Sequence, residues 1–441
     1  LVLFTTAGYW AVRSYLDLEN LDFVFWVLGI TTSIVAVLYV LNIFNIDLIG
    51  AYADTAVVER AQFFSTLGQK DFNGCFFSVA LPIVFYQFLN AKDTRTAVWT
   101  GIPAAFGALA LAVVDSEALA LGIGAAVMVL VCHKNFTTRH LRRAALISAA
   151  FFGWAAWMHY MRASVYTQGG TALLAKLGAW QVALPCMAAS LLLWLVLFVL
   201  ARKGIAAQAP LYLPGRGITI AVLAVGALAF VLANAMPNRP LPESLHNLLV
   251  FNDDWGTYRG VAWRAAFGTW ADGSLLRKIV GIGPGMMHTA VAAWAGDAMT
   301  ARMATFYAAH NEYLEQLLTT GILGLTAWLL LVAAHLQRGE RSWNTPGVAP
   351  VMLALCSYLA QAVVSIRVSM VFPLVMLLFG ALAALELPQP AAPALRGKKQ
   401  QKPEPLPPKN AWYFAKTVLA AVLCMAAASG IAPLLFGFLM G

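Results

Sequence analysis

The sequence predicts an all-α integral membrane protein with about twelve transmembrane helices and one long extracytoplasmic loop that caps the outer face. The first observation is composition: 61% of the 441 residues are hydrophobic, 11% are charged and the mean hydropathy is +0.73. A soluble domain is about 45–50% apolar and about 25% charged. The second observation is apolar runs near the ~20 residues that cross a bilayer as a helix. These features exclude a soluble enzyme, a disulfide scaffold, a disordered chain and a β-barrel, whose strands would alternate polar and apolar residues.

Apolar segments define the predicted spans, and the first of them is a truncated helix. They are residues 1–12, 21–44, 74–91, 97–114, 118–132, 144–160, 179–201, 217–235, 318–337, 348–366, 369–387 and 412–438. The chain therefore divides into spans one to eight (1–235), the large loop (236–317), spans nine to eleven (318–387), a linker rich in Pro and Lys (388–411) and the last span (412–441).

Basic residues predict the orientation, because Lys and Arg concentrate in cytoplasmic loops. One set of loops, together with Lys416, holds 18 of the 29 Lys and Arg residues, and the short loops opposite hold five. The basic side is therefore predicted to be cytoplasmic, and the loop 236–317 faces outside. This distribution explains the net charge of +9 through membrane topology and contact with membrane lipid, so no nucleic acid partner is expected.

The five cysteines are scattered and have no CxxC spacing. This pattern predicts neither a disulfide framework nor a zinc site. No cofactor motif stands out elsewhere, and none is expected.

The long loop carries the first candidate for chemistry. Arg259 and Trp263 are four residues apart, so a helix places both on one face. A guanidinium held against an indole is fixed in direction and stays charged. The same spacing also allows an interfacial aromatic belt with arginines that extend toward lipid headgroups.

Two further motifs follow in the loop. The segment Gly281–Gly285 could present backbone N–H groups to phosphate, but it lacks the Lys-Ser/Thr pair of a P-loop and Pro284 removes a donor. A tight turn that positions the loop is the favoured interpretation. His310 and Asn311 then precede a helical pattern that enters the membrane. A neutral histidine there can accept a proton near neutral pH, although a lone histidine is often structural.

These motifs resemble a known family. The segment AHNEYLEQLLTTGILGL, residues 309–325, resembles the HNxYL…GxxGL signature of the O-antigen ligase and Wzy-type polymerase superfamily. The order Arg259, Trp263, Gly281–Gly285 and His310 is also similar to the order in that family. KDFNGCFFSVALPI at 70–83 resembles an early family stretch that leads into a helix. The resemblance covers most of the chain.

The resemblance implies a membrane glycosyltransferase of cell-surface polysaccharide biosynthesis. Such enzymes move a glycan from an undecaprenyl-diphosphate carrier to a hydroxyl of a glycan or lipid-linked sugar acceptor, on the outer face of the bacterial cytoplasmic membrane. They include ligases that act in lipopolysaccharide biosynthesis, polymerases and protein oligosaccharyltransferases, and they need no metal. Carried over, His310 and Arg259 are catalytic, and Trp263, Arg264 and Asn311 bind substrate.

One departure from the family matters. Where many members carry a Ser-Arg-Gly-like motif, this chain has Ser116-Glu117-Ala118, so a carboxylate replaces a cation. A diphosphate would then need a cation from another helix. Arg162 and Arg367 lie on the correct side of the predicted topology, and Arg367 is preferred because its outer turn is short.

Two alternatives remain at this stage. Asp253 and Asp254 could bind Mg²⁺ across a diphosphate in a metal-dependent transferase, or form an ordinary polar turn. Twelve helices would also suit a secondary transporter or a flippase for lipid-linked glycans. The absence of an evident inverted repeat and the few charges within the spans favour the transferase.

Overall fold

The computed structural model describes residues 2–16, 18–50, 52, 63–114, 116–165, 177–205, 207–236, 241–300 and 307–385. Within these ranges the protein is all-α apart from a small antiparallel hairpin, in which Phe63–Phe64 (β1) pairs with Gly68–Gln69 (β2). Six of the described helices are long and apolar enough to cross a membrane. The all-α membrane class is thereby confirmed.

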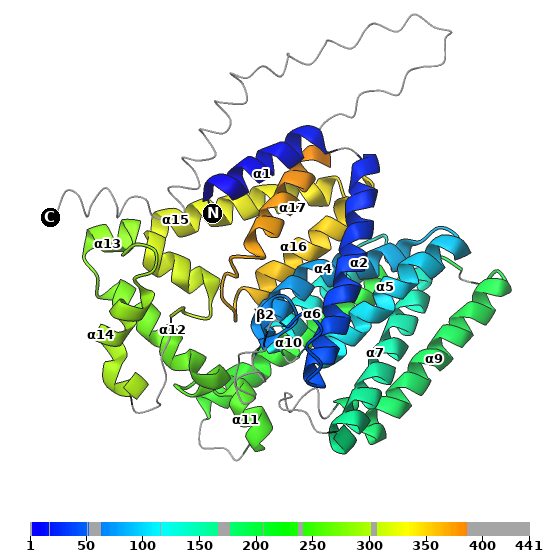
Figure 1. Cartoon of the computed structure of the whole chain (residues 1–441), viewed down its shortest axis with the longest axis horizontal. Helices are drawn as coiled ribbons and strands as arrows, with labels where there is room; N and C mark the ends of the chain where they lie inside the picture. Colours follow the sequence, from blue (N-terminus) through cyan, green and yellow to red (C-terminus); the bar gives the residue numbers. More distant parts are fainter. Residues whose placement is uncertain are drawn as a thin grey trace, which may run out of the picture.

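The described helices run in chain order from α1 to α17 (Figure 1). Up to residue 235 they are α1 (Val2–Tyr15), α2 (Leu18–Ile43), α4 (Lys70–Asn90), α5 (Thr94–Val113), α6 (Glu117–Cys132), α7 (Thr138–Val165), α9 (Trp180–Arg202) and α10 (Tyr212–Ala235). Beyond residue 240 they are α11 (Glu243–Leu249), α12 (Trp255–Ala271), α13 (Leu275–Val280), α14 (Met287–Thr300), α15 (Glu312–Arg341), α16 (Val348–Gln361) and α17 (Phe372–Leu385).

Every apolar segment predicted before residue 388 corresponds to a helix, although some boundaries differ. The predicted segment 348–366 ends early, at Gln361, and the next helix begins at Phe372 rather than at 369. The residues between them turn back toward α15, as described below. The predicted linker 388–411 and last span 412–438 lie outside the described residues, so the number of spans and their sidedness stay predictions.

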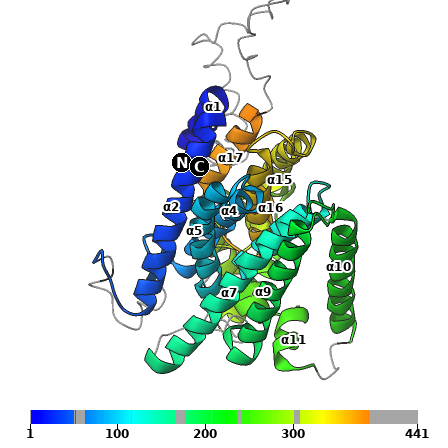
Figure 2. The ribbon, with the colours of Figure 1, turned by 90° about the vertical axis from the view of Figure 1, so that its right-hand side faces the viewer.

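Helices α9 and α10 expose apolar side chains to their surroundings. Only 6% of the most apolar window of each is buried inside the protein, and α10 stands at the margin of the bundle, above α11 (Figure 2). Val225 and Ile220 of α10 are each 67% exposed. Such surfaces suit a lipid solvent, in which a helix satisfies its own backbone hydrogen bonds.

The largest core surrounds α16 and α17. Leu355 from α16 and Val375 and Phe379 from α17 are fully buried there, and Cys75 and Val79 reach the same core from α4. Helix α4 is the most enclosed candidate span, with 78% of its window buried. The enclosed part of α4 begins at Asn73, shortly after the start of the helix.

The long loop folds as helices that pack against the first part of α15. Helices α12, α13 and α14 lie together on one side of the bundle (Figure 1). Val261 of α12, Val291 of α14 and Leu318 of α15 share one buried cluster. The expected folding of this loop against the membrane helices is thus seen, whereas its position on the outer face stays a prediction.

Helix α15 is interrupted at Gly321, whose φ of 67° and ψ of −170° are not helical. The Leu318 and Thr319 carbonyls just before the break accept hydrogen bonds from the N–H groups of Ile282 and Gly283, both at 3.0 Å. A helix that stops inside a protein leaves carbonyls without partners, and the glycine-rich turn supplies these partners. The turn is therefore structural, as the sequence favoured.

Close contact between Gly281 and α15 allows this pairing. A Cβ on Gly281 would lie 2.3 Å from the Thr319 carbonyl, and a Cβ on Gly321 would lie 2.2 Å from the Ile279 carbonyl oxygen. Both glycines also have positive φ, which other residues adopt at a cost. Neither position accepts a side chain without displacement of the backbone.

We predict that Gly321→Ala lowers the free energy of unfolding by about 2 kcal/mol or more, because the new Cβ meets backbone and the conformation is strained. Thermal unfolding of the purified protein in detergent, followed by tryptophan fluorescence, measures the change. Gly226→Ala in α10 is the matched control, since a Cβ there meets nothing within 4 Å. Equal unfolding temperatures for the two variants would contradict the role of the break.

Candidate functional site

His310 lies directly before α15 in a strained backbone conformation. Its φ of 50° falls in the left-handed region, where a residue other than glycine costs of order 1 kcal/mol or more. Such a conformation persists only where the neighbouring structure imposes it. The position of this histidine is therefore determined by the residues on each side of it and by the helices they contact.

Asn311 fixes the C-terminal side of His310. Its side-chain oxygen accepts hydrogen bonds from the N–H groups of Tyr313 and Leu314, each at 3.0 Å, so Asn311 is the N-cap of α15. An N-cap side chain satisfies backbone donors that have no partner within the helix. Asn311 is 7% exposed. The structure gives it this capping role, and its predicted contact with substrate stays a prediction.

Arg259 begins the regular part of α12. The three residues before it, Gly256 to Tyr258, all have positive φ and form a tight turn. The half-buried Arg259 side chain bends back over this turn, and its Nη1 donates to the Gly256 carbonyl oxygen at 2.7 Å. The guanidinium is thus oriented by its own helix start.

The charges of Arg259 and Asp71, which come from two other elements, both act on His310. Burial lowers the pKa of His310 first, the positive charge of Arg259 lowers it further, and the carboxylate of Asp71 opposes them. Such influence requires the charges to lie near the imidazole. The net effect favours the neutral imidazole, which is the form that accepts a proton. The two residues that the resemblance marked as catalytic therefore lie within electrostatic range of each other.

Asp71 is the functional candidate that sequence reasoning missed. It lies in the first turn of α4, within the KDFNG stretch noted above, and it accepts a 3.3 Å hydrogen bond from the Ser116 hydroxyl before α6. The signal was a carboxylate at the entrance of an otherwise apolar span. Glu117, next to Ser116, is exposed, so its side chain is turned away from the buried face that carries Ser116.

Trp263 and Arg264 are adjacent in the chain, but their side chains contact different residues. Trp263 packs against Phe251 and Trp255, with ring centroids 6.1 and 5.1 Å apart. Across the described residues, no cation–π contact joins it to Arg259, so the interaction expected from their spacing is not seen.

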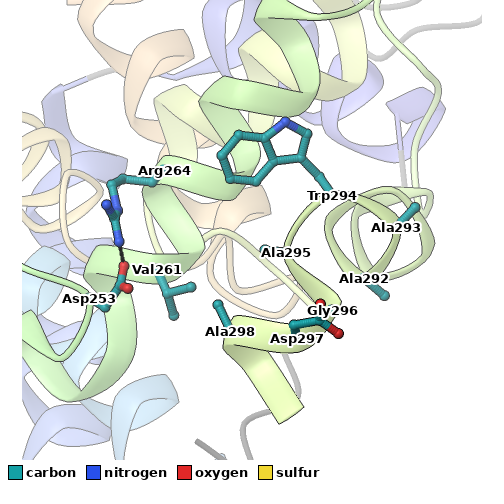
Figure 3. Close-up of a pocket in the computed structure, with 10 residues that line it drawn as sticks. All are labelled: Asp253, Val261, Arg264, Ala292, Ala293, Trp294, Ala295, Gly296, Asp297 and Ala298. Carbon is teal, nitrogen blue, oxygen red and sulfur yellow. Dashed lines mark ion pairs between the residues drawn. The ribbon is translucent and has the colours of Figure 1, made fainter. Parts of the chain in front are cut away.

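Arg264 lies five residues after Arg259, which turns its side chain about 140° around the helix. It forms an ion pair with Asp253 (Figure 3). That pair also occupies one of the two carboxylates considered as magnesium ligands. Substrate contacts for Arg264 and Trp263 stay predictions.

Arg367 is held by a buried polar cluster. Its Nε and Nη2 donate to Glu312 Oε1, each at 2.6 Å, and Nη2 also donates to Gln316 Oε1 at 2.8 Å. Tyr358 donates to the other carboxylate oxygen of Glu312 at 2.6 Å. The guanidinium also lies over the Phe372 ring, 4.5 Å from its centroid. Arg367 therefore has a protein carboxylate as its partner.

This cluster anchors the residues beside His310. Glu312 is 3% exposed, and its backbone N–H donates to the Ala362 carbonyl at 2.9 Å. Gln316 connects Arg367 to the second half of α15, because its Nε2 donates to the Gly324 carbonyl across the break. Arg367 is thus near the candidate site and acts there through Glu312, whereas its direct contact with a donor stays a prediction. The side chain of Arg162, at the end of α7, lies outside the described part.

No protein-family model matches the chain, and no curated protein matches it either. The family resemblance therefore stays an expectation drawn from the motifs.

We predict that Arg367→Met lowers the free energy of unfolding by about 3–5 kcal/mol, because it leaves the buried Glu312 carboxylate without its cation. Glu312→Gln combined with Arg367→Met should recover part of this loss. Arg264→Met is the matched control: its ion pair carries an arginine that is 55% exposed, and exposed pairs contribute about 0–1 kcal/mol. Denaturant unfolding in detergent measures all three, and similar losses for both single variants would refute the assignment.

Proposed function

We propose that the chain is a membrane glycosyltransferase that moves a glycan from an undecaprenyl-diphosphate carrier to an acceptor hydroxyl, as in O-antigen ligases and polysaccharide polymerases. The observation that supports it most is that His310, at the start of a candidate membrane helix, is within electrostatic range of both Arg259 and Asp71. We further propose that this site faces the outside of a bacterial cytoplasmic membrane.

In this proposal His310 is the general base. The neutral imidazole removes the proton from the acceptor hydroxyl as the oxygen attacks the anomeric carbon of the donor sugar. The bond between that carbon and the diphosphate oxygen breaks, and the electron pair leaves with the carrier. Asp71 stabilises the imidazolium that forms, and the imidazolium becomes neutral again when its proton passes to solvent.

Arg259 neutralises the leaving group. A lipid diphosphate departs readily only if its developing negative charge is stabilised, and a guanidinium does this through a fork of N–H donors. One of these donors is bound to Gly256, which holds the fork in one direction. Trp263, Arg264, Asn311, Arg367 and Arg162 remain proposed contacts for the glycan or the carrier.

We predict that His310→Ala reduces glycosyl transfer about 10²-fold or more while the protein still inserts and folds. Arg259→Lys keeps the positive charge but loses the planar fork of N–H donors. It should therefore reduce the rate of transfer mainly by weakening the contact with the donor diphosphate. The assay uses the purified protein in nanodiscs with lipid-diphosphate glycan and follows the mass of the acceptor. Arg277→Ala, in the same loop and without a placed role, is the control. Near-normal transfer by well-folded His310→Ala would disprove the role of the base.

The pH dependence follows from the surroundings of His310. Burial and Arg259 place its pKa below the ordinary 6.5, and the neutral form is the active one. The rate of transfer should therefore rise with pH and reach half of its maximum below pH 6.5. At higher pH it should approach that maximum. Asp71→Asn removes the group that raises this pKa, so the midpoint should move to lower pH. The profile of kcat/KM reports it, and a midpoint above 6.5 in the wild type would contradict the proposal.

A further inference from the structure

A cleft of about 470 Å³ lies between α12 and α14, apart from the meeting point of His310, Arg259 and Asp71. Asp253, Val261 and Arg264 form one wall, and residues 292–298 form the other (Figure 3). The volume is within the range of small-ligand sites. None of the groups assigned above to the reaction, His310, Arg259 and Asp71, lines this cleft.

Trp294 supplies a fixed aromatic surface on this cleft. Its indole rests on Gly268 of α12, where a Cβ would lie 2.2 Å from the ring, and its Nε1 donates to Asp272 Oδ2 at 2.8 Å. The side chain is nevertheless 46% exposed. An aromatic ring that is held on one side and open on the other is a prepared contact surface for the flat, apolar face of a ligand.

The interruption of α14 shapes the same wall that carries Trp294. Ala295 has φ −128° and ψ 22°, which breaks the helix at the cleft. The backbone leaves the regular helical path at this residue, so its peptide groups are no longer all aligned along the helix axis. The next residue, Gly296, has open space where a Cβ would stand. A ligand can therefore approach the backbone closely at this point.

The charges of the cleft exclude an anionic ligand. Its lining contains one guanidinium, Arg264, and two carboxylates, Asp253 and Asp297, and the guanidinium is already paired with Asp253. A diphosphate would meet net negative charge. A neutral ligand with many hydroxyl groups fits instead, because hydroxyls both donate to carboxylates and accept from guanidinium and backbone N–H groups.

The cleft adjoins the turn that carries Arg259. The Asp253 carbonyl accepts the N–H of Val261 at 3.1 Å. Gly260 packs so tightly on Asn252 that a Cβ would lie 1.8 Å from its carbonyl oxygen. Val261, which lines the cleft, thus lies two residues after Arg259 on α12.

We propose that this cleft is a saccharide-binding subsite, in which a sugar ring stacks on Trp294 and its hydroxyls bond to Asp297, the Arg264–Asp253 pair and the backbone at Gly296. The assignment rests on the proposed glycosyl transfer and specifies where one glycan lies during it. The shared chemistry is a neutral saccharide, which can belong to the acceptor or to the donor.

The first experiment measures binding without transfer. The probe is the lipid-free oligosaccharide released by mild acid from the surface polysaccharide of the bacterium that encodes the chain. Saturation-transfer NMR reports its binding to the full-length protein in nanodiscs. We expect Trp294→Ala to weaken binding about five- to tenfold, Asp297→Asn to weaken it less, and Trp294→Phe to restore most of it. Trp99→Ala is the control, because Trp99 is also exposed, at 61%, and lies on α5, far along the chain from the cleft.

The second experiment measures transfer and assigns the saccharide. A raised KM for the acceptor in Trp294→Ala identifies an acceptor subsite, and a raised KM for the donor identifies a donor-glycan subsite, with kcat little changed in both cases. If the wild-type protein binds the oligosaccharide through Trp294 but shows no transfer, the subsite is supported and the proposed function is refuted. If wild type does not bind the probe, or if Trp294→Ala binds it and turns it over like wild type, the subsite is refuted.

Discussion

The interruption of α15 at Gly321 is the constraint on which the candidate site depends. Carbonyl groups that end a helix inside the protein must find donors, and here the turn at Gly281–Gly283 provides them. This pairing brings the long loop, and with it α12, against the first half of α15. Arg259 and His310 are about fifty residues apart in the chain and meet because of that packing.

The buried carboxylate of Glu312 holds the same half-helix on its other side. A charge in this environment is stable only with a partner and with its remaining oxygen hydrogen-bonded, and Arg367 and Tyr358 meet both needs. The arrangement also explains why the helix after α16 starts late. The chain between Gln361 and Phe372 leaves the helical path and directs Arg367 toward α15.

At His310 and next to Arg259 the backbone adopts conformations that are locally unfavourable and that the packing of the protein imposes. His310 has φ 50°, and Thr257 and Tyr258, just before Arg259, have φ 60° and 68°. Non-glycine residues avoid this region unless tertiary contacts hold them there. The hydrogen bond from the Glu312 N–H to the Ala362 carbonyl is such a contact beside His310, and the N-cap at Asn311 and the close approach of Gly260 to Asn252 add local support. Both side chains are consequently positioned before any substrate arrives, which reduces the ordering required in the reaction.

The sequence by itself determined the membrane class, each helix formed by an apolar run before residue 388 and the structural role of the glycine-rich turn. It also marked His310 and Arg259 as candidates, and their catalytic role stays a prediction. Hydropathy and spacing are properties of neighbouring residues, so a single chain displays them. The tertiary structure alone decided that Asp71 joins His310, that Glu312 holds Arg367, and that Trp294 opens onto a cleft beside Arg264. These pairs are 30 to 239 positions apart in the chain, and their energy comes from burial and charge pairing that no local pattern records.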